Sequence, residues 1–497
     1  MEKRFVDFFE RNYAPINGVP IGRPTFCAEI DNHHEVNIPL KTLTRHGLIT
    51  GSTGTGKSRV VQLLIEKLSE KKIPVFLSDI KGDMSGFCIA GDTGKVAARA
   101  EELNYIFAAK SFKTNYWSSQ DGLINFRISL ANVDFVILAK LLELNPTQES
   151  HLGSVYKYAQ DKKIEITNLK NLNDVISYLI EYPEKNIGSS KSSLSVIYRK
   201  INNLEYSHLD RFFGLPTFSV ADFLSEEINV LWLQNYHKEK FNIGNLVSFF
   251  LYRLYGELPE VGDVQQPKLV VFIDEAHQIF ANANDNLVNL MVSILKQIRS
   301  RGVGIIFNTQ NAEDIPEKIL EQLGLKIQFA LRAFSLKELQ DIRGAMNSFP
   351  ASALYDLKEE VKALASGTAF VSVLNDAGEL LPPVKTVIYP PVSLMDAPEL
   401  VSIISASNKA LVEKYCETDL VKSIELGSPL DNVSVSRGGK WDISKYIERK
   451  EEQKVKRITS KRNRDIKKFM YLLIVILGLI ALIFFLFLVF KVINKVG

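Results

Sequence analysis

The sequence contains little cysteine. The 497 residues include only Cys27, Cys88 and Cys416, which lie far apart in the chain. None of them belongs to a CxxC pair or lies beside histidine at the spacing of zinc ligands. These absences exclude a disulfide framework and a zinc finger, and they favour a reducing compartment.

The chain also lacks a strong excess of charge of one sign, because its net charge is only +3. Residues 454–497 hold ten Lys and Arg against one acid, so removing their +9 leaves residues 1–453 with a net charge of −6. The large N-terminal part is therefore mildly acidic. A site for a polyanion on that part must be a local basic patch.

Long hydrophobic runs are missing from most of the chain, and we expect no signal peptide because none occurs near the N-terminus. One run does occur late, at residues 469–490, which are twenty-two residues without a charge. As a helix this run spans about 33 Å, enough to cross a bilayer core. A buried core helix is the alternative, but such a helix normally carries a polar stripe.

The charges around this run predict its orientation. Eight basic residues lie within 454–468, whereas only Lys491 and Lys495 follow the run. Because cytoplasmic flanks carry the excess of Lys and Arg, we expect a single-pass protein of the inner or cytoplasmic membrane with its N-terminal part in the cytoplasm. The basic flank could also bind nucleic acid or anionic lipid, although topology alone accounts for it.

Upstream of the tail, short apolar runs alternate with amphipathic helical stretches, which predicts an α/β fold with a parallel sheet. The expected strands are 48–50, 75–79, 230–234, 269–274, 304–309 and 327–332. Apolar runs at 368–374 and 381–387 flank Asn-Asp-Ala-Gly and predict a hairpin. The expected divisions are an N-terminal segment 1–45, a nucleotide-binding core 46–396 with a helical insertion at about 130–225, a charged helical linker 397–468, the transmembrane helix 469–490 and a short tail 491–497.

A phosphate-binding loop follows the first expected strand of the core. The matching residues of the pattern GxxxxGK[ST] are Gly51, Ser52, Thr53, Gly54, Thr55, Gly56, Lys57 and Ser58. Glycines allow backbone N–H groups to surround phosphate, and the following helix adds its positive N-terminal dipole. We expect Lys57 to contact the β- and γ-phosphates of ATP and Ser58 to bind Mg²⁺.

Two carboxylates end the apolar run 269–273, on what we expect to be a strand neighbouring that of the loop. Asp274 would hold Mg²⁺, and Glu275 would act as the general base that activates water. This pair favours hydrolysis over simple nucleotide binding. The alternative is an ordinary strand end that carries two acids.

Other polar side chains follow expected strands. The polar residues Asn308, Thr309 and Gln310 at the end of the strand 304–309 could sense the γ-phosphate and position water, or form a plain polar turn. Arg332 could reach the γ-phosphate of a neighbouring subunit, or form a surface salt bridge. Residues 79–83 follow the strand that begins at 75, so we expect them at the same sheet edge as the phosphate loop, with Asp79 among the nucleotide-binding residues; a plain turn is the alternative.

Taken together, six strings resemble a bacterial HerA-like P-loop ATPase family of the HerA/FtsK superfamily. They are GLITGSTGTGKS, SDIKGDMSG, LLELNPTQESHL, VVFIDEAHQIF, RSRGVGIIFNTQNAEDIPEKILEQLG and IQFALRAFSLKEL. The resemblance extends over residues 17–394 and does not include the C-terminal apolar run. It implies a RecA-like core, hexameric rings and ATP-driven movement along DNA. It also implies Lys57 and Ser58 on phosphate and Mg²⁺, Asp274 and Glu275 as the Walker B pair, Gln310 as a sensor, and an arginine near Arg332 acting in trans.

Two functions therefore fit the sequence. The first is a membrane-tethered ATPase, hexameric as this resemblance implies, that acts on double-stranded DNA as a translocase or helicase. The second is a membrane-bound, ATP-driven switch or assembly engine for a protein partner, which the acidic body and the membrane anchor favour. A DEAH-box helicase, suggested by residues 274–277, does not fit because no QxxGRxGR-like string follows.

Overall fold

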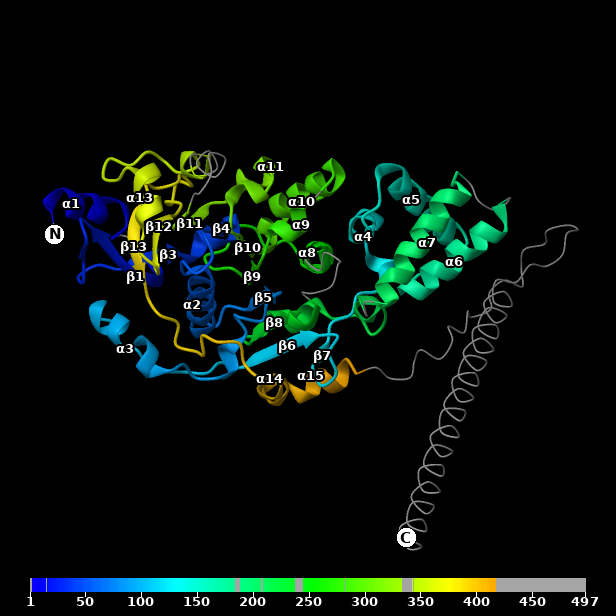
Figure 1. Ribbon diagram of the computed structural model, residues 1–497, viewed down its shortest axis with the longest axis horizontal. Coiled ribbons are helices and arrows are strands. Elements are labelled where there is room, and N and C mark those ends of the chain that lie inside the picture. The colour runs from blue at the N-terminus through cyan, green and yellow to red at the C-terminus, as the bar shows by residue number, and fades with distance from the viewer. Residues whose placement is uncertain are drawn as a thin grey trace, which may run out of the picture. The chain divides into compact units, whose positions relative to one another are not determined.

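One large mixed sheet organises the fold, in the strand order β2-β1-β13-β12-β11-β4-β10-β9-β5-β8-β6-β7, with β3 paired to β1 (Figure 1). The computed structural model describes residues 2–14, 16–183, 188–206, 209–236, 245–281, 283–332, 342 and 344–416. The strands are β1 Gly18–Phe26, β2 Glu29–Ile30, β3 Val36–Pro39, β4 Gly47–Thr50, β5 Val75–Asp79, β6 Thr114–Ser118, β7 Ile124–Asn125, β8 Ile228–Trp232, β9 Leu269–Ile273, β10 Val303–Asn308, β11 Leu325–Phe329, β12 Thr368–Ser372 and β13 Val384–Ile388.

Helices connect and cover these strands. They are α1 Lys3–Asn12, α2 Lys57–Glu70, α3 Thr93–Glu102, α4 Phe135–Leu141, α5 Pro146–Asp161, α6 Leu169–Glu181, α7 Lys191–Tyr206, α8 Asn245–Glu257, α9 His277–Phe280, α10 Asp285–Ile298, α11 Glu317–Leu320, α13 Leu357–Ala363, α14 Leu400–Ala406 and α15 Lys409–Lys414. The alternation of strands and helices confirms the predicted α/β class.

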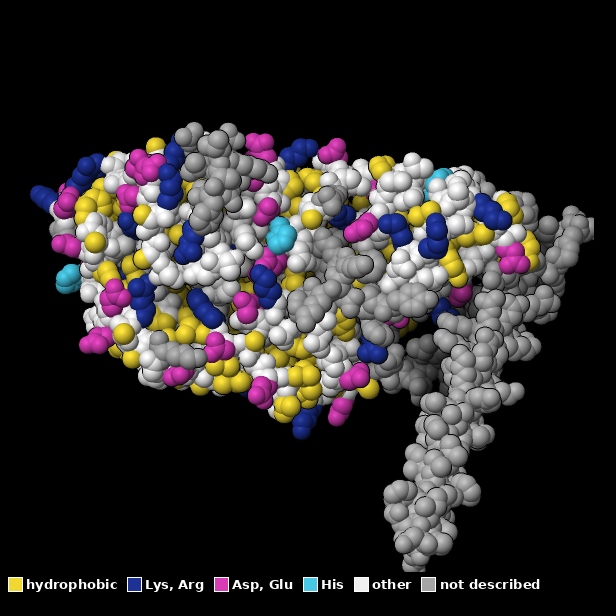
Figure 2. Space-filling view, in the orientation of Figure 1, with side chains coloured by type: hydrophobic (Ala, Val, Ile, Leu, Met, Phe, Trp, Pro, Cys, Tyr) yellow, Lys and Arg dark blue, Asp and Glu magenta, His cyan; other side chains and the backbone are white. Residues whose placement is uncertain are grey.

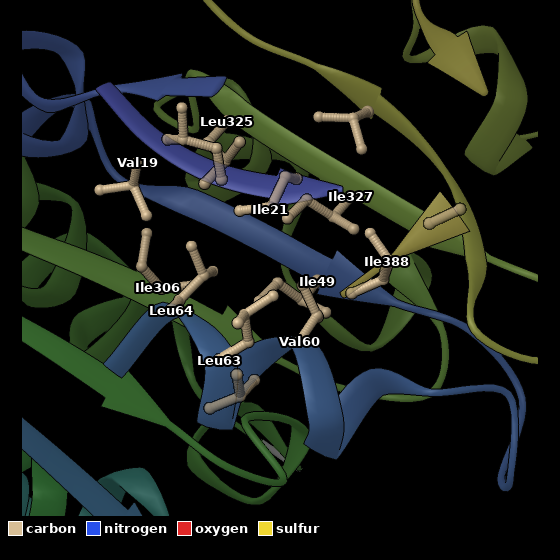
Figure 3. Packing of buried hydrophobic residues seen from close by; sticks show 14 of the residues in the cluster. Val19, Ile21, Ile49, Val60, Leu63, Leu64, Ile306, Leu325, Ile327 and Ile388 are labelled. Atoms are coloured by element: carbon tan, nitrogen blue, oxygen red, sulfur yellow. The ribbon is translucent and has the colours of Figure 1, made fainter. Parts of the chain in front are cut away.

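The middle of the sheet is parallel, from β11 through β4, β10, β9, β5 and β8 to β6. Every residue of β4, β5, β9 and β10 is buried, as expected for parallel strands covered on both faces. In Figure 3 side chains of α2 pack against strands of the sheet; the labelled residues are Val19, Ile21, Ile49, Val60, Leu63, Leu64, Ile306, Leu325, Ile327 and Ile388.

The predicted hairpin is present as the antiparallel pair β12 and β13. The structure extends it with β1, which pairs antiparallel with β13, so residues 18–26 join the sheet of the core. Two other expected strands are shifted toward the N-terminus. The strand expected at 230–234 is Ile228–Trp232, and that expected at 327–332 is Leu325–Phe329, because alternation of apolar residues does not mark exact strand ends.

The predicted helical insertion is formed by α4 to α7 (Figure 1). It packs on the core through α4, which contacts α8 and α10. The Glu149 carboxylate, on α5, accepts hydrogen bonds of 2.8 Å from the side-chain amides of Asn284 and Asn286. The insertion is thereby attached to the chain that follows β9.

Residues after β13 cross the outside of α2. The buried Glu66 carboxylate accepts hydrogen bonds from the backbone N–H groups of Val392, at 2.8 Å, and Ser393, at 2.9 Å. Helices α14 and α15 then contact β6 and β7 at the far edge of the sheet. Residues 397–416 of the expected linker therefore pack on the core, where Ile403 and Tyr415 are buried.

The remainder of that linker, the predicted span 469–490 and the tail lie outside the described residues. Among the residues that the structure describes, no helix has the length and apolar character needed to cross a membrane.

Candidate active site

The phosphate-binding loop joins the end of β4 to the start of α2. Gly51, Gly54 and Gly56 have φ angles of +148°, +78° and +121°, a backbone region that favours glycine. At Gly51 an added Cβ would also lie 2.6 Å from Phe329 Cβ. Backbone conformation therefore favours glycine at all three positions, and close packing adds to this at Gly51.

Neighbouring segments hold the loop in place. Gly51 N–H donates to the Gln310 carbonyl over 3.3 Å, Ser52 N–H donates to the Ala330 carbonyl over 2.8 Å, and Gly367 N–H donates to the Thr55 carbonyl over 2.8 Å. Within the described residues, no acceptor is recorded for the backbone N–H groups of residues 53–58. Those amides are the donors that a chain of phosphates requires.

Two side chains complete the phosphate site. The Lys57 ammonium donates to the carbonyls of Gly51, at 2.5 Å, and Ser52, at 3.0 Å, and burial lowers the pKa of Lys57. Ser58 follows in the first turn of α2 and is partly buried. Both residues therefore stand where the sequence predicted, at the junction of loop and helix.

The sequence predicted Asp274 on a strand next to that of the phosphate loop, and this prediction is wrong. Asp274 follows β9, and β10 lies between β9 and β4. Strand order depends on long-range pairing, which local sequence does not reveal. The intervening strand brings Asn308 to the site, where its Nδ2 donates to Asp274 Oδ1 over 2.7 Å.

Three carboxylates gather beside the loop. Oxygens of Asp79, Asp83 and Asp274 all lie within 4.8 Å of one another. Burial and then the Asp83 charge raise the pKa of Asp79 to about 6, although Ser85 donates to it. Burial also raises the pKa of Asp274 well above its usual value, and the Asp79 charge adds to this rise.

These carboxylates fit a divalent cation. Asp83 Oδ1 and Asn308 Oδ1 are buried without a hydrogen-bond partner among the described residues, and oxygen ligands are those that Mg²⁺ prefers. Asp274 and Ser58 would hold the ion, with Asp83 beside them, and the ion would neutralise phosphate charge during hydrolysis. Asp79 stabilises the turn after β5, because its oxygens accept hydrogen bonds from Gly82 N–H, Met84 N–H and Ser85 Oγ–H.

Glu275 pairs with Lys81 and lies beside His277. Its backbone has a φ of +48°, which is uncommon for a residue with a side chain. Lys81 forms an ion pair with its Oε1, and His277 Nδ1 lies 3.1 Å from its Oε2. Burial alone would raise the pKa of Glu275, but the contacts with His277 and Lys81 bring it to about 2.

The remaining predicted residues lie at the same sheet edge. The Gln310 side chain is exposed, and the Gln310 carbonyl holds Gly51. Arg332 is exposed three residues beyond β11, and its backbone N–H donates to Ser52 Oγ over 3.0 Å. A sensor role for Gln310 and a role in trans for Arg332 stay predictions.

The sequence predicted residues 79–83 and 308–310 at the site only as groups, so Lys81, Asp83 and Asn308 had no individual roles, and His277 had none. Lys81, Asp83 and His277 follow a buried strand within a few residues and Asn308 ends one, at the carboxyl edge where ligands bind in parallel sheets. That position was the signal available in the sequence. The actual partners depend on contacts across strands that are far apart in the chain.

Known proteins resemble this chain over most of its length. Residues 26–418 match the family described as Helicase HerA-like C-terminal. The DNA double-strand break repair helicase HerA of Sulfurisphaera tokodaii is 26% identical over 59% of this chain and 56% of its own length. The DNA import protein CedB of Sulfolobus acidocaldarius is 25% identical over 57% of this chain and 44% of its own length. The chain thus spans about half the length of these two relatives.

Solved structures share the fold. VirB4 of Thermoanaerobacter pseudethanolicus has a TM-score of 0.50 and 15% identity, over 75% of this chain and 97% of its own. The plasmid coupling protein TrwB, in complex with the GTP analogue GDPNP, has a TM-score of 0.50 and 14% identity, over 77% of this chain and 99% of its own. At this identity the likeness concerns the P-loop NTPase fold alone.

Proposed function

Because the chain belongs to the Helicase HerA-like C-terminal family, we propose that this P-loop ATPase uses ATP hydrolysis to move double-stranded DNA as a translocase or helicase. The observation that carries the proposal is the convergence of Lys57, Asp274 and Glu275 at one sheet edge around unpaired loop amides. This set binds phosphate, holds Mg²⁺ and activates water. The HerA and CedB relatives, named for DNA repair and DNA import, supply the DNA substrate of the proposal.

The hydrolytic chemistry follows from these groups. Water attacks the γ-phosphorus while the bond to the bridging oxygen of ADP breaks, and Glu275 takes the proton of the water. Lys57 and the loop amides stabilise the charge on the phosphate oxygens. ATP with Mg²⁺ is therefore the proposed substrate, and TrwB, solved with a nucleotide analogue, has the same fold.

We infer further that the protein forms a hexameric ring held at the cytoplasmic face of the membrane. Arg332 supports the ring, because its exposed side chain beside the loop is free to meet a neighbouring subunit. The apolar run 469–490 and the basic flank 454–468 support the anchor.

A protein partner in place of DNA is the second candidate function. Residues 1–453 carry a net charge of −6, and Figure 2 shows acidic and basic side chains interspersed over the visible face of the described residues. A mixed surface of this kind suits a protein partner better than a DNA backbone, which selects a basic face.

Steady-state ATP hydrolysis by the full-length protein in detergent distinguishes the two functions. Double-stranded DNA should stimulate turnover, and this stimulation should weaken as salt rises because phosphate contacts release counterions. Glu275→Gln is the control for contaminating ATPases. Turnover that is insensitive to DNA at every salt concentration would favour the protein-partner function.

A further inference from the structure

We propose that Lys81 is a positioning residue for hydrolysis with two successive partners: it holds Glu275 in the arrangement seen here and moves to the γ-phosphate when ATP binds. This inference depends on ATP hydrolysis by the site described above. It does not depend on DNA as the substrate.

The first partner is visible in the structure. Lys81 pairs with one carboxylate oxygen of Glu275, and His277 lies 3.1 Å from the other. A general base needs an oxygen directed at water and enough basicity to take a proton. The ammonium of Lys81 occupies Oε1 of Glu275, so this ion pair must break before that oxygen can take a proton from water.

Lys81 is the partner that can leave. Its side chain is 50% exposed, whereas that of Glu275 is 8% exposed. His277 is only two residues from Glu275 and begins α9, so its position follows that of Glu275. Lysine in contrast has a flexible four-carbon stem and three donors that can exchange partners.

The backbone that carries Lys81 is fixed while the side chain is not. Asp79, which is fully buried, accepts hydrogen bonds from Gly82 N–H at 2.7 Å, Met84 N–H at 3.1 Å and Ser85 Oγ–H at 2.5 Å. These bonds close the turn after β5 around Lys81. Movement of the ammonium therefore requires only rotation about side-chain bonds.

The second partner follows from the position of this turn. Lys81 lies in the turn between Asp79 and Asp83 of the carboxylate cluster and pairs with Glu275, the residue after Asp274, so its ammonium lies beside the expected site of Mg²⁺ and the γ-phosphate. The γ-phosphate of ATP offers several anionic oxygens there, whereas ADP lacks that group. ATP would draw Lys81 from Glu275, and ADP would leave the pair intact, so the base is released only when there is a bond to hydrolyse.

The test compares Lys81→Met, which keeps the length of the side chain without its charge, with the wild-type full-length protein. We expect an ADP affinity close to wild type, because ADP makes no contact with Lys81. The preference for the β,γ-imido analogue of ATP over ADP should fall about tenfold or more, the scale of a hydrogen bond to a charged group. Turnover should fall by a similar factor, and Lys81→Arg should restore part of both.

Lys110→Met is the matched control. Lys110 is 52% exposed and pairs with Glu70 at 3.2 Å on the surface, so its loss should change neither the preference nor turnover. A Lys81→Met protein with wild-type preference and turnover would overturn the proposal. Faster turnover with an unchanged preference would also overturn it, because Lys81 would then hold Glu275 without ever binding phosphate.

A second test uses only the wild-type protein, so it does not require that a variant fold correctly. Acylation of lysines, followed by mass spectrometry, reports the accessibility of each ammonium. The imido analogue should protect Lys81 severalfold more than ADP does, with Lys110 unchanged. Equal protection by both nucleotides would contradict a contact with the γ-phosphate.

Discussion

Asn308 donates its side-chain amide to Asp274 Oδ1 over 2.7 Å and so joins the end of β10 to the end of β9. Asn308 is 4% exposed, and its own Oδ1 has no hydrogen-bond partner among the described residues. The amide thus fixes the orientation of a carboxylate that is expected to hold Mg²⁺, in the way that outer residues orient metal ligands.

Asn308→Ala should lower the apparent affinity of the ATPase for Mg²⁺. Without the amide, Asp274 loses its orienting donor, so the Mg²⁺ concentration for half-maximal ATPase activity should rise about tenfold or more. Titration of activity with Mg²⁺ measures this. Asn375→Ala removes an exposed Asn–Glu contact of 3.2 Å from the β12–β13 turn and should leave the titration unchanged. An unchanged titration for Asn308→Ala would refute the role of its amide.

Glu275→Gln should separate binding from hydrolysis. The amide cannot take a proton, so turnover should fall about 100-fold or more, while the loop amides and Lys57 still bind nucleotide. Binding of a fluorescent ATP analogue and phosphate release measure the two effects. Lys57→Ala should instead weaken binding itself. Wild-type turnover by Glu275→Gln would show that another group is the base.

Mixing two inactive variants tests the ring. Each site is expected to combine Glu275 of one subunit with Arg332 of the next, since a closed ring arranges subunits head to tail. Glu275→Gln and Arg332→Ala should each have little activity alone. Rings assembled from both should regain part of it, because some interfaces pair an intact Glu275 with an intact Arg332. Full activity of Arg332→Ala alone would leave Arg332 as a surface residue.

The predicted membrane span has a direct test. Full-length protein should remain in the membrane fraction after washing with high salt and with carbonate, since hydrophobic insertion resists both. Deletion from Phe469 onward should release the protein. Replacement of the basic residues of 454–468 with glutamine serves as the control for electrostatic attachment. Recovery of the full-length protein in the soluble fraction would exclude the anchor.

His46 should make stability depend on pH. It is buried between Leu295 and Ile305: Nε2 lies 2.9 Å from the Leu295 carbonyl, and Ile305 N–H donates to Nδ1 over 3.1 Å. Burial lowers the pKa of His46 from 6.5 to about 4. Between these pH values the unfolded chain therefore binds a proton at His46 more readily than the folded chain does. The contribution of neutral His46 to folding stability is fully present above pH 6.5 and is lost as the pH falls toward 4. The loss is about 3 kcal/mol.

Urea unfolding at pH 7.5 and at pH 5 measures this dependence. The free energy of unfolding of His46→Asn should depend less on pH, because asparagine does not titrate. Asparagine also tolerates the φ of +58° at this position. His33→Asn, at an exposed histidine, should keep the wild-type dependence. An identical slope for His46→Asn and wild type would show that another group is responsible.

The sequence by itself determined the parts of the site that depend on neighbouring residues. The loop from Gly51 to Ser58 is one continuous string, and its glycines and helix start follow from local backbone conformation. The carboxylates Asp274 and Glu275 follow an apolar run whose short length indicates a buried strand. Alternation of strands and helices likewise indicated the α/β class, because periodicity is a local property.

Only the tertiary structure decided which of these parts meet. The position of β10 between β4 and β9, and of β1 beside β13, depends on pairing between segments far apart in the chain. The same is true of Lys81, which is 194 residues from Glu275 and forms an ion pair with it. No periodicity encodes such a contact, because its energy arises when strands are assembled side by side and their carboxyl ends come together.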